Sequence, residues 1–374
     1  MTAPWLEEHE NLWRECDERI TPDAVVALLA VVADTPAPSG ASSLTRGVEV
    51  RTWCEKDGLL DEGADLRLDV FRTGCDLLER GSGGLRMLAH LDEVSYLVEG
   101  SSGVQGRWWV APYCYHLAEV PAPARVVRFA ADGGWNVIAA GHVSVCEGSH
   151  VFETADSVRL APGDRVSLAS DVALDATGRV TGSLDNAAGV TAALLAASVL
   201  ARLGVPFSVA LTDEEEGPSG AASQTIARGA ARLFHHLHDA PLTVAIDIHG
   251  VPDREAAAVD GHHRPWGASL AEFSSHGRGS VAPPHLYAGV AGLLCDLGDR
   301  GVLVQQNVGG YVPRSDDVVA MTRGNRVVVL GYPGVNRHFD RGLPAAHVED
   351  LMHLARALVV LAVAVHAGHL AVDW

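Results

Sequence analysis

The organisation of this chain is set around residues 85–93, which read Leu-Arg-Met-Leu-Ala-His-Leu-Asp-Glu. The first five predict a short strand, and His90 follows at the carboxyl end of that strand. A metal-bound imidazole needs a carboxylate or a carbonyl on its second nitrogen, and Asp92 stands two positions further on. A lone histidine here would more often be structural, so its interpretation depends on the rest of the chain.

Four further stretches carry side chains of the same chemistry. They are Ser183-Leu184-Asp185-Asn186, Asp213-Glu214-Glu215-Glu216-Gly217, Ala245-Ile246-Asp247 and Asn336-Arg337-His338. Borderline and hard divalent cations take imidazole nitrogen and carboxylate oxygen, and a pair of them needs about five such side chains with one carboxylate shared. No single stretch is specific, but their order and contexts together predict a two-metal hydrolase.

Each carboxylate stretch also has an ordinary structural interpretation. Asp185-Asn186 precedes a predicted helix, where Asp and Asn are common N-caps. The acidic run 213–216 is typical of a solvated face. It directly follows the apolar strand 207–211, however, where repelling carboxylates need the compensation that metal ions provide. Asp247 likewise ends an apolar strand, where an unpaired acid is costly.

The last histidine of the set, His338, lies in a turn-rich loop, 331–340, after a predicted strand. Its competitors as a ligand are His249 and His347.

Adjacent glutamates such as those of the acidic run can have different roles, because one can bind a metal ion while its neighbour holds the proton of the metal-bound water. The lack of a Gly-x-Ser-x-Gly motif disfavours a serine hydrolase.

The composition argues against several other classes of protein. The chain has 374 residues, 48% of them hydrophobic, which is enough for one large core or two domains. Its formal charge of −19 argues against nucleic acids and anionic membranes as partners. Lys56 is the only lysine, which removes the P-loop motif and makes Schiff-base chemistry improbable. Six scattered cysteines and an acidic N-terminal segment without a signal pattern lead us to expect a cytoplasmic protein.

Predicted strands and helices alternate on both sides of a β-rich region. Short alternating runs between about 100 and 181, separated by Gly, Pro and Asp, predict a small barrel or sandwich. The other main elements are the apolar strands 207–211, 242–246 and 327–330 and the amphipathic helix 190–203. They predict an α/β sheet with a site at the strand ends. The apolar run 355–372 is interrupted by Arg356 and His366 and predicts a buried helix rather than a membrane span.

These motifs resemble those of the dizinc aminopeptidase superfamily. His90-Leu-Asp-Glu-Val resembles the His-Met-Asp-Glu-Ile motif of the tetrahedral (glutamyl/leucyl) aminopeptidase family, and residues 214–221 resemble its Glu-Glu-Val-Gly-x-x-Gly-Ala motif. Residues 160–166, Leu-Ala-Pro-Gly-Asp-Arg-Val, resemble the segment that closes the inserted β domain of that family. The step of 95 positions from His90 to Asp185 leaves room for such a domain between the two ligands. The similarity covers roughly residues 20–368.

The resemblance implies a mixed-sheet α/β/α sandwich of the aminopeptidase type with an inserted small β-barrel domain. Residues 1–99 and 182–374 would form the catalytic domain, and 100–181 the inserted domain that governs oligomerisation and access to the site. It also implies two divalent metal ions per subunit, zinc or cobalt. The partners would be a small peptide or aminoacyl amide substrate and other copies of the chain.

The resemblance also implies a role for each residue of the site. The ligand set is His90 and Asp247 at one metal, Glu215 and His338 at the other, and Asp185 bridging both. Glu214 would be the general base, and Asp92 would orient His90.

Three departures from the family bear on the substrate. Ala187 stands where the family usually has Arg, residues 314–318 replace a Gly-Gly-Thr-Asp-Ala pattern, and His338 lacks the usual Ser-Pro after it. The favoured function is an aminopeptidase that releases N-terminal residues from small peptides, with Asp316 or Asp317 binding the free amino group. A solvated acidic turn is the alternative for these two carboxylates. A metal-dependent amidase or deacylase acting on a specialised small molecule, and a catalytically silent relative, remain alternative functions.

Overall fold

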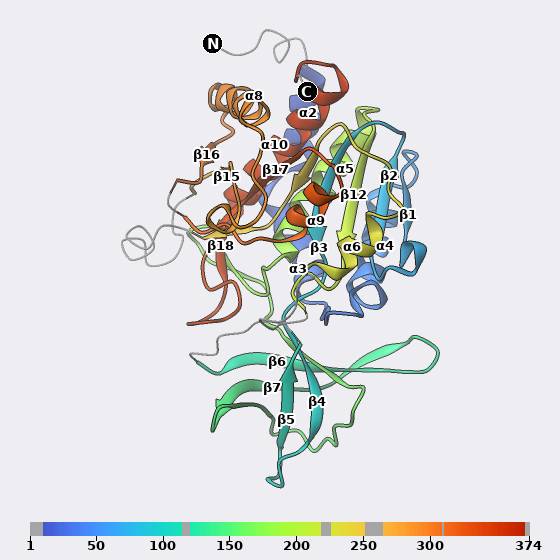
Figure 1. Ribbon diagram of the computed structural model, residues 1–374, viewed down its shortest axis with the longest axis vertical. Helices are drawn as coiled ribbons and strands as arrows, with labels where there is room; N and C mark the ends of the chain where they lie inside the picture. Colours follow the sequence, from blue (N-terminus) through green and yellow to red (C-terminus); the bar gives the residue numbers. More distant parts are fainter. Residues whose placement is uncertain (1–9, 114–119, 218–225, 251–264, 309, 371–374) are drawn as a thin grey trace.

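The computed structural model describes the chain except for residues 1–9, 114–119, 218–225, 251–264, 309 and 371–374. Its larger part is a mixed sheet flanked by helices, and a β-barrel projects from one end of it (Figure 1). The strand order in the sheet is β1-β2-β12-β3-β13-β17-β15-β16, with β14 paired to β17. The bounds are Asp65–Arg67 (β1), Asp76–Arg80 (β2), Leu85–His90 (β3), Phe207–Thr212 (β12), Thr243–Ala245 (β13), Ile248–Gly250 (β14), Ala268–Ala271 (β15), Val304–Gln306 (β16) and Val327–Gly334 (β17).

The four strands β12, β3, β13 and β17 run parallel in the middle of the sheet. Strands β2 and β15 are antiparallel to their neighbours in this group. Every residue of β3, β12 and β17 is buried, as expected of parallel strands that are covered on both faces. Because the carboxyl ends of the parallel strands share one edge of the sheet, polar residues that follow them are brought together there.

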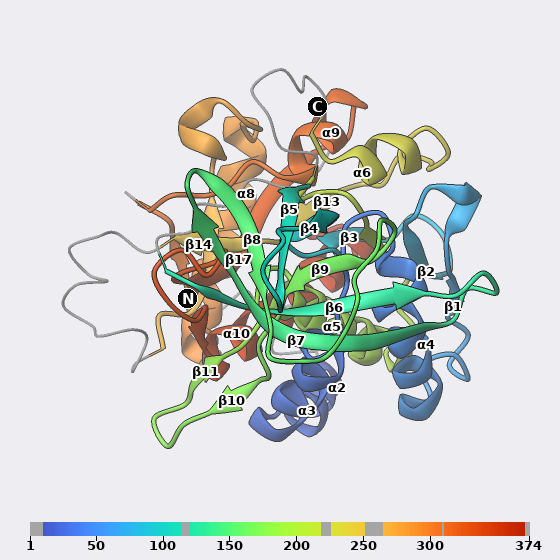
Figure 2. The same ribbon diagram turned by 90° about the horizontal axis from the view of Figure 1, so that it is seen from below.

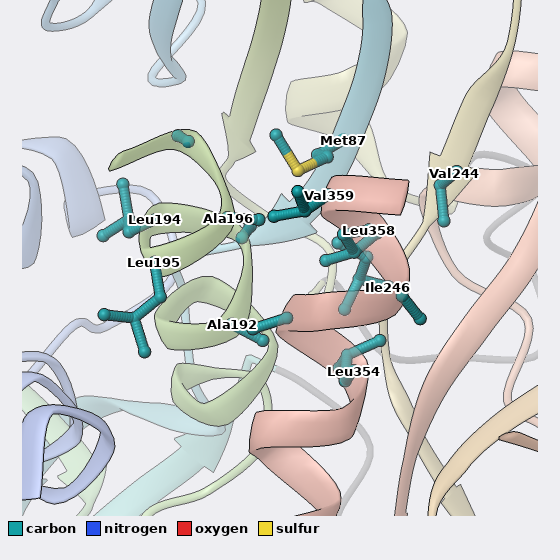
Figure 3. Packing of buried hydrophobic residues seen from close by; sticks show 14 of the residues in the cluster. Met87, Ala192, Leu194, Leu195, Ala196, Val244, Ile246, Leu354, Leu358 and Val359 are labelled. Atoms are coloured by element: carbon teal, nitrogen blue, oxygen red, sulfur yellow. The ribbon is translucent and has the colours of Figure 1, made fainter. Parts of the chain in front are cut away.

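Helices cover both faces of the sheet. The bounds are Glu10–Arg19 (α2), Pro22–Ala33 (α3), Arg46–Asp57 (α4), Ala187–Arg202 (α5), Arg228–Leu233 (α6), Pro284–Cys295 (α8), Asp316–Thr322 (α9) and Val348–His366 (α10), with short 3-10 turns at Ser42–Leu44, Val70–Arg72, Ser275–Gly277 and Asp296–Arg300. Successive strand residues point to opposite faces, so Met87 and Val244 join the main core with α5 and α10 (Figure 3). Leu88 and Ala245 join a second core with α6 and α9 on the other face.

The barrel closes in the strand order β4-β5-β8-β7-β6-β9 and is seen from below in Figure 2. The bounds are Ser95–Ser101 (β4), Arg107–Pro112 (β5), Ala122–Phe129 (β6), Trp135–Cys146 (β7), Ser149–Glu153 (β8) and Arg165–Leu168 (β9). It has a core of its own, in which Tyr96, Trp108 and Phe152 are the large side chains. The predicted fold class, an α/β domain with an inserted small β-barrel, is confirmed.

The barrel strands span residues 95–168, whereas the sequence placed the inserted domain at 100–181. Strands β10 (Ala173–Leu174) and β11 (Arg179–Thr181) form a separate small sheet with β18 (Ala345–His347). This sheet joins the segment before Asp185 to the segment after His338 and so brings two distant parts of the sequence together. Among the described residues, no helix is long and apolar enough to span a membrane, and α10 is a largely buried helix of the core.

Candidate metal centre

The candidate site lies at the carboxyl ends of the central parallel strands. His90 is the last residue of β3, and Asp247 follows β13 after one intervening residue. The acidic run begins directly after β12, and His338 lies four residues after the end of β17. Asp185 comes from the other direction, just before α5. Sequence-distant residues therefore meet because their strands are neighbours in one sheet.

Asn186 fixes the approach of Asp185 to this edge. Its side-chain Nδ2 donates a hydrogen bond to the carbonyl of Ile246 at 2.6 Å, next to Asp247. Asn186 occupies the N-cap position of α5, but its side chain makes no capping hydrogen bond. The ordinary N-cap interpretation therefore does not account for this side chain, which instead ties the start of α5 to the end of β13.

Asp185 lies between the two imidazoles of the site. Its Oδ1 is 3.3 Å from Nε2 of His90, and its Oδ2 is 3.5 Å from Nε2 of His338. Asp247 Oδ1 lies 4.0 Å from the same nitrogen of His90. Glu216 Oε2 lies 3.1 Å from Nε2 of His338. Each imidazole thus lies beside one oxygen of the shared Asp185 and beside at least one further carboxylate.

The described part of the chain contains three overlapping groups of potential ligand residues. Within each group, the ligand atoms all lie within 4.8 Å of one another. The groups are His90–Asp185–Asp247, Asp185–Glu216–His338 and His90–Glu215–Glu216. Each group has one imidazole and two carboxylates, and the first two groups share Asp185. Glu215 belongs only to the third group, with its Oε2 3.7 Å from Nε2 of His90.

The donor atoms of this site fit a metal. Both carboxylate oxygens of Asp185, Oε1 of Glu216 and Nε2 of His338 are buried, and none makes a hydrogen bond with a described residue. Buried polar atoms are nearly always satisfied, so a group of such atoms converging on one point indicates a missing partner. Imidazole nitrogen and carboxylate oxygen are suitable ligands for borderline divalent cations. The structure therefore contains a buried His/Asp/Glu cluster suited to metal binding.

The charges of the cluster shift the pKa values of its members. Burial alone would lower the pKa of His90, but Glu215, Asp185 and Asp247 raise it well above its usual range. His338 behaves similarly, because Glu216 and Asp185 outweigh burial and the charge of Arg337 and raise its pKa to about 9.

The carboxylates of the cluster respond in two ways. Burial alone would raise the pKa of Asp185, but its close contacts with His338 and His90 hold that pKa below the usual range. Burial, followed by the charge of Asp185, raises the pKa of Asp247 instead. Burial also raises the pKa of Glu215, and the neighbouring Glu216 adds to this. The cluster thus concentrates more negative charge than its imidazoles can balance.

Asp92 holds the site together through two different groups. Its backbone carbonyl lies 3.0 Å from Nδ1 of His90. Since a carbonyl only accepts, Nδ1 carries the hydrogen and Nε2 is left to face Asp185. The carboxylate of Asp92 lies further away, at 3.7 Å, and instead accepts the backbone amides of Glu215 and Glu216 at 3.1 and 3.2 Å. Asp92 thus orients His90 by its main chain and the acidic run by its side chain.

Glu214 faces different partners from its neighbours. Its carboxylate accepts a hydrogen bond from the hydroxyl of Tyr113, just after β5 of the barrel, and pairs with Arg232 of α6 at 2.5 Å. Among the described residues it belongs to none of the ligand groups. The backbone of Glu214 has a φ of 56°, a left-handed conformation that redirects the chain between Asp213 and Glu215. Glu214 therefore links the acidic run to the barrel.

Asp316 and Asp317 are the first two residues of α9, and their side chains are already engaged. Asp317 accepts hydrogen bonds from the hydroxyl groups of Ser274 and Ser280 and from the amide of Ser315. Asp316 accepts the hydroxyl hydrogen of Thr212, and burial raises its pKa to about 7. The two residues are only 2% and 1% exposed, respectively. Their predicted role in binding an amino group stays a prediction, and this burial argues against it.

The competing histidines lie elsewhere in hydrogen-bond networks. Nδ1 of His249 lies 2.8 Å from the hydroxyl of Ser269, and burial lowers the pKa of His249 to about 3. Nε2 of His347 lies 3.0 Å from the carbonyl of Thr177, and its Nδ1 accepts the amide of Glu349 at the start of α10. Neither belongs to a ligand group in the described ranges, whereas His338 does.

Two residues of this site had no role assigned from the sequence, Glu216 and Arg337. Glu216 is the third of three consecutive glutamates, and nothing in the sequence distinguishes it from the other two. Arg337 immediately precedes a predicted ligand, and its Nη1 lies 3.8 Å from Oδ2 of Asp185. Its position next to His338 in a loop at the strand ends was the available signal.

No model of a known protein family matches the chain, and no curated protein matches it. Solved structures do. The TET1 peptidase of Pyrococcus horikoshii, described as assembling into a tetrahedron or a large octahedral shell, is 18% identical over 90% of this chain and 99% of its own, with a TM-score of 0.67. Aminopeptidase APDkam598 from the archaeon Desulfurococcus kamchatkensis is 18% identical over 91% of this chain and 95% of its own, with a TM-score of 0.69.

A more distant match is an M18-family aminopeptidase from Thermotoga maritima, 14% identical over 94% of this chain and 96% of its own, with a TM-score of 0.59. A Thermotoga maritima protein described as an endoglucanase matches with the same TM-score, at 18% identity over 91% of this chain and 97% of its own. At these identities the matches show the fold. The chain therefore has the fold of the TET aminopeptidases, as the motifs predicted, and its reaction must be inferred from the site.

Proposed function

We propose that this chain is a hydrolase that cleaves an amide bond with two divalent metal ions, zinc or cobalt. The favoured activity is that of an aminopeptidase acting on small peptides. The observation that carries the proposal is the position of Asp185, which lies between two groups that each contain one imidazole and one further carboxylate. Two ions that share one carboxylate need this arrangement of ligands.

The geometry favours a ligand assignment that differs by one residue from the one implied by the motif. We assign His90 and Asp247 to one ion, His338 and Glu216 to the other, and Asp185 to both. This partition follows the two ligand groups that share Asp185. When bound, the ions would polarise the carbonyl of the substrate and increase the acidity of water.

Glu215 is left as the general base. Its carboxylate lies near His90 and Glu216, one member of each ligand group, but belongs to neither of the two groups that share Asp185. The backbone amide of Glu215 donates a hydrogen bond to the carboxylate of Asp92. From there Glu215 would take a proton from the attacking water and transfer it to the leaving nitrogen as the carbon–nitrogen bond breaks. The products are a carboxylic acid and an amine. Glu214, which the motif assigned to this role, would instead anchor the acidic run through Tyr113 and Arg232.

A metal-dependent amidase or deacylase is the second candidate, and the burial of Asp316 and Asp317 favours it. Recognition of a free amino group needs a carboxylate that the substrate can reach, and these two candidates are hydrogen bonded and inaccessible. A catalytically silent relative has less support, because the buried His, Asp and Glu side chains could hold two ions and still leave Glu215 as a base. We expect the protein to act in the cytoplasm as a homo-oligomer, without nucleic-acid or membrane partners.

The test combines metal analysis with a substrate screen. The purified protein would be loaded with zinc or cobalt, dialysed and analysed for bound metal. It would then be assayed with aminoacyl-arylamides, dipeptides and N-acyl amino acids. Hydrolysis that chelation abolishes and metal restores supports the proposal. Bound metal without hydrolysis of any of these amides would favour the silent relative. Faster cleavage of free than of N-acetylated forms would select the aminopeptidase over the amidase.

A further inference from the structure

Arg337 places a positive charge at the edge of the candidate metal centre. Its Nη1 lies 3.8 Å from Oδ2 of Asp185, and its side chain is 32% exposed while that of Asp185 is 2% exposed. Within the described part of the chain, the guanidinium donates no hydrogen bond to another residue, and this ionic contact is the one found for it. Arg337 therefore reaches from solvent to the shared ligand, and most of its donors remain available.

The loop around Arg337 is fixed at both ends. Before it, the backbone of Val335 exchanges two hydrogen bonds with Ala345, at 3.0 and 3.1 Å. After it, Phe339 is 4% exposed and packs into the barrel core, and its amide donates to the carbonyl of Asn336. Asn336 and Phe339 both have positive φ angles, 55° and 59°. Such conformations persist in residues other than glycine where the surrounding structure determines them, often at functional sites.

This turn gives two consecutive side chains different tasks. His338 is 5% exposed and points its Nε2 at Asp185 and Glu216. Arg337 lies beside the same carboxylate and also lines a small cavity there with Ser183 and Phe339. The side chain of Arg337 is 32% exposed, so part of it stays accessible from solvent while Nη1 lies next to Asp185.

The chemistry of arginine narrows the choice of ligand. A guanidinium presents a planar fork of donors that matches the two oxygens of a carboxylate. Metal ions, once bound, would take over the neutralisation of Asp185 and Glu216, which leaves the fork free for another anion. The carboxylates expected to bind an amino group, Asp316 and Asp317, are buried. At Arg337 the site therefore offers a substrate a positive charge, which suits a negatively charged group of that substrate.

We propose that Arg337 binds a substrate carboxylate on the leaving-group side of the scissile amide. The substrates would then be dipeptides or N-acylated amino acids, in which the carboxylate lies one residue from the bond that is cut. Consecutive α-carbons are about 3.8 Å apart, so this carboxylate stays within reach of a side chain that borders the shared metal ligand. Longer peptides and neutral amides lack the group at that position. The proposal rests on the proposed amide hydrolase function.

The test compares free acids with their amides. Metal-loaded wild type, Arg337→Ala and Arg337→Lys would be assayed with alanyl-leucine against alanyl-leucinamide, and with N-acetyl-leucine against N-acetyl-leucinamide. We expect the wild type to prefer the free acids. Arg337→Ala should raise KM for the acids at least ~10-fold, the scale of a lost charge-assisted contact, with little change for the amides. Arg337→Lys should fall between, because it keeps the charge and loses the fork.

A binding measurement separates this subsite from catalysis. Calorimetric titration with leucine and N-acetyl-leucine should show binding to the metal-loaded wild type and at least ~10-fold weaker binding to Arg337→Ala, with equal metal content in both. Arg341→Ala, an exposed arginine of the same loop, is the matched control and should change neither affinity nor KM.

Three outcomes would overturn the proposal. Equal cleavage of acids and amides by the wild type would leave the hydrolase intact and remove the subsite. An equal loss of kcat for both in Arg337→Ala would place the arginine at the reacting carbonyl instead. If the wild type neither cuts the substrates nor binds the acids, both proposals fail. If the wild type binds the acids but cuts no substrate, and Arg337→Ala no longer binds them, the subsite is supported and the hydrolase function is not.

Discussion

Glu216 Oε2 lies 3.1 Å from Nε2 of His338, so Glu216 occupies the place beside that imidazole which the motif assigned to Glu215. The distinction matters because the three consecutive glutamates of the acidic run contact three different sets of partners. Glu214 contacts the barrel and α6, Glu215 contacts His90, and Glu216 contacts His338. Each can therefore be tested separately.

The first prediction concerns metal content. Glu216→Gln should lower bound metal from two equivalents toward one, because it removes an anionic ligand from only one group. Asp185→Asn should lower occupancy of both positions, because both groups share Asp185. Glu214→Gln is the control and should keep the wild-type content. Elemental analysis after equilibrium dialysis measures this. Full metal content in Glu216→Gln would show that Glu216 is not a ligand.

The second prediction separates the general base from its neighbour. Glu215→Gln should bind metal normally and lose at least ~10²-fold in kcat, the usual scale for a positioned acid or base. Glu214→Gln should stay much closer to the wild type, because its carboxylate faces Tyr113 and Arg232. Steady-state kinetics on the best substrate from the screen decide between them. The reverse pattern would restore the motif-based assignment of Glu214.

The third prediction concerns the contact between the barrel and the acidic run. A Cβ added at Gly217 would fall 2.7 Å from the ring of Tyr113 and 2.8 Å from its carbonyl oxygen. Gly217→Ala should therefore destabilise the protein by about 1–3 kcal/mol and reduce activity, since overpacking shifts the neighbouring backbone. Gly292→Ala in α8, where nothing lies within 4 Å, is the matched control and should be neutral or stabilising. Urea unfolding and kinetics measure both, and an unchanged Gly217→Ala would refute the close contact.

The fourth prediction concerns pH and a histidine outside the metal centre. Burial lowers the pKa of His353 to about 4, and its Nδ1 accepts the amide of Leu303 at 3.3 Å. Between pH 6.5 and about 4 the unfolded chain binds this proton and the folded chain does not. The free energy of unfolding should therefore fall as the pH drops through this window, with the full contribution present above pH 6.5.

The size of this contribution is about 1–3 kcal/mol, allowing for partial solvent screening. Urea unfolding of chelator-treated protein at several pH values measures it, since metal release then adds nothing. His353→Gln should show a shallower pH dependence than the wild type. His366→Gln, on the exposed end of α10, should not. Parallel pH profiles for His353→Gln and the wild type would contradict the assignment.

The fifth prediction concerns self-association through the barrel. Val137 and Val145 of β7 are 44% and 47% exposed, so they offer apolar area that a second copy of the chain could bury. We expect the wild type to form a closed homo-oligomer and Val137→Asp to weaken it. Val308→Asp, at a 78% exposed valine outside the barrel, is the control. Sedimentation velocity at micromolar concentrations measures this, and a strictly monomeric wild type would contradict it.

Local sequence was sufficient for the elements that carry the ligands. The predicted strand at 85–89 is observed as β3, which ends at His90, and the predicted strand at 207–211 is observed as β12. The predicted helix at 190–203 is observed as α5, with almost every residue buried. These segments are long apolar or periodic runs, so side-chain pattern alone specifies them. The spacing between His90 and Asp185 likewise indicated the inserted barrel.

The division of roles within the acidic run was decided only by the tertiary structure. In a loop, the direction of each side chain is not set by a periodic backbone, so neighbouring glutamates are equivalent in the sequence. Here the left-handed φ of Glu214, the two amide hydrogen bonds to Asp92 and the contact with Tyr113 turn them apart. These partners lie about 100 or more residues away in the sequence, at 113 and 92, and only folding brings them to the run.

Asp316 and Asp317 also show that sequence alone did not decide which acidic side chains face the site. Two adjacent acids before a helix indicate a polar turn or a binding site, and the sequence could not distinguish these. In the fold, the serines at 274, 280 and 315 bind the carboxylate of Asp317, and Thr212 binds one oxygen of Asp316, so both side chains are held inside the protein. Arg337, by contrast, had no assigned role and lies partly exposed beside Asp185. Residue type and local pattern determined which chemistry the chain carries, and long-range packing decided which of those groups face the site, because burial and partners depend on the whole fold.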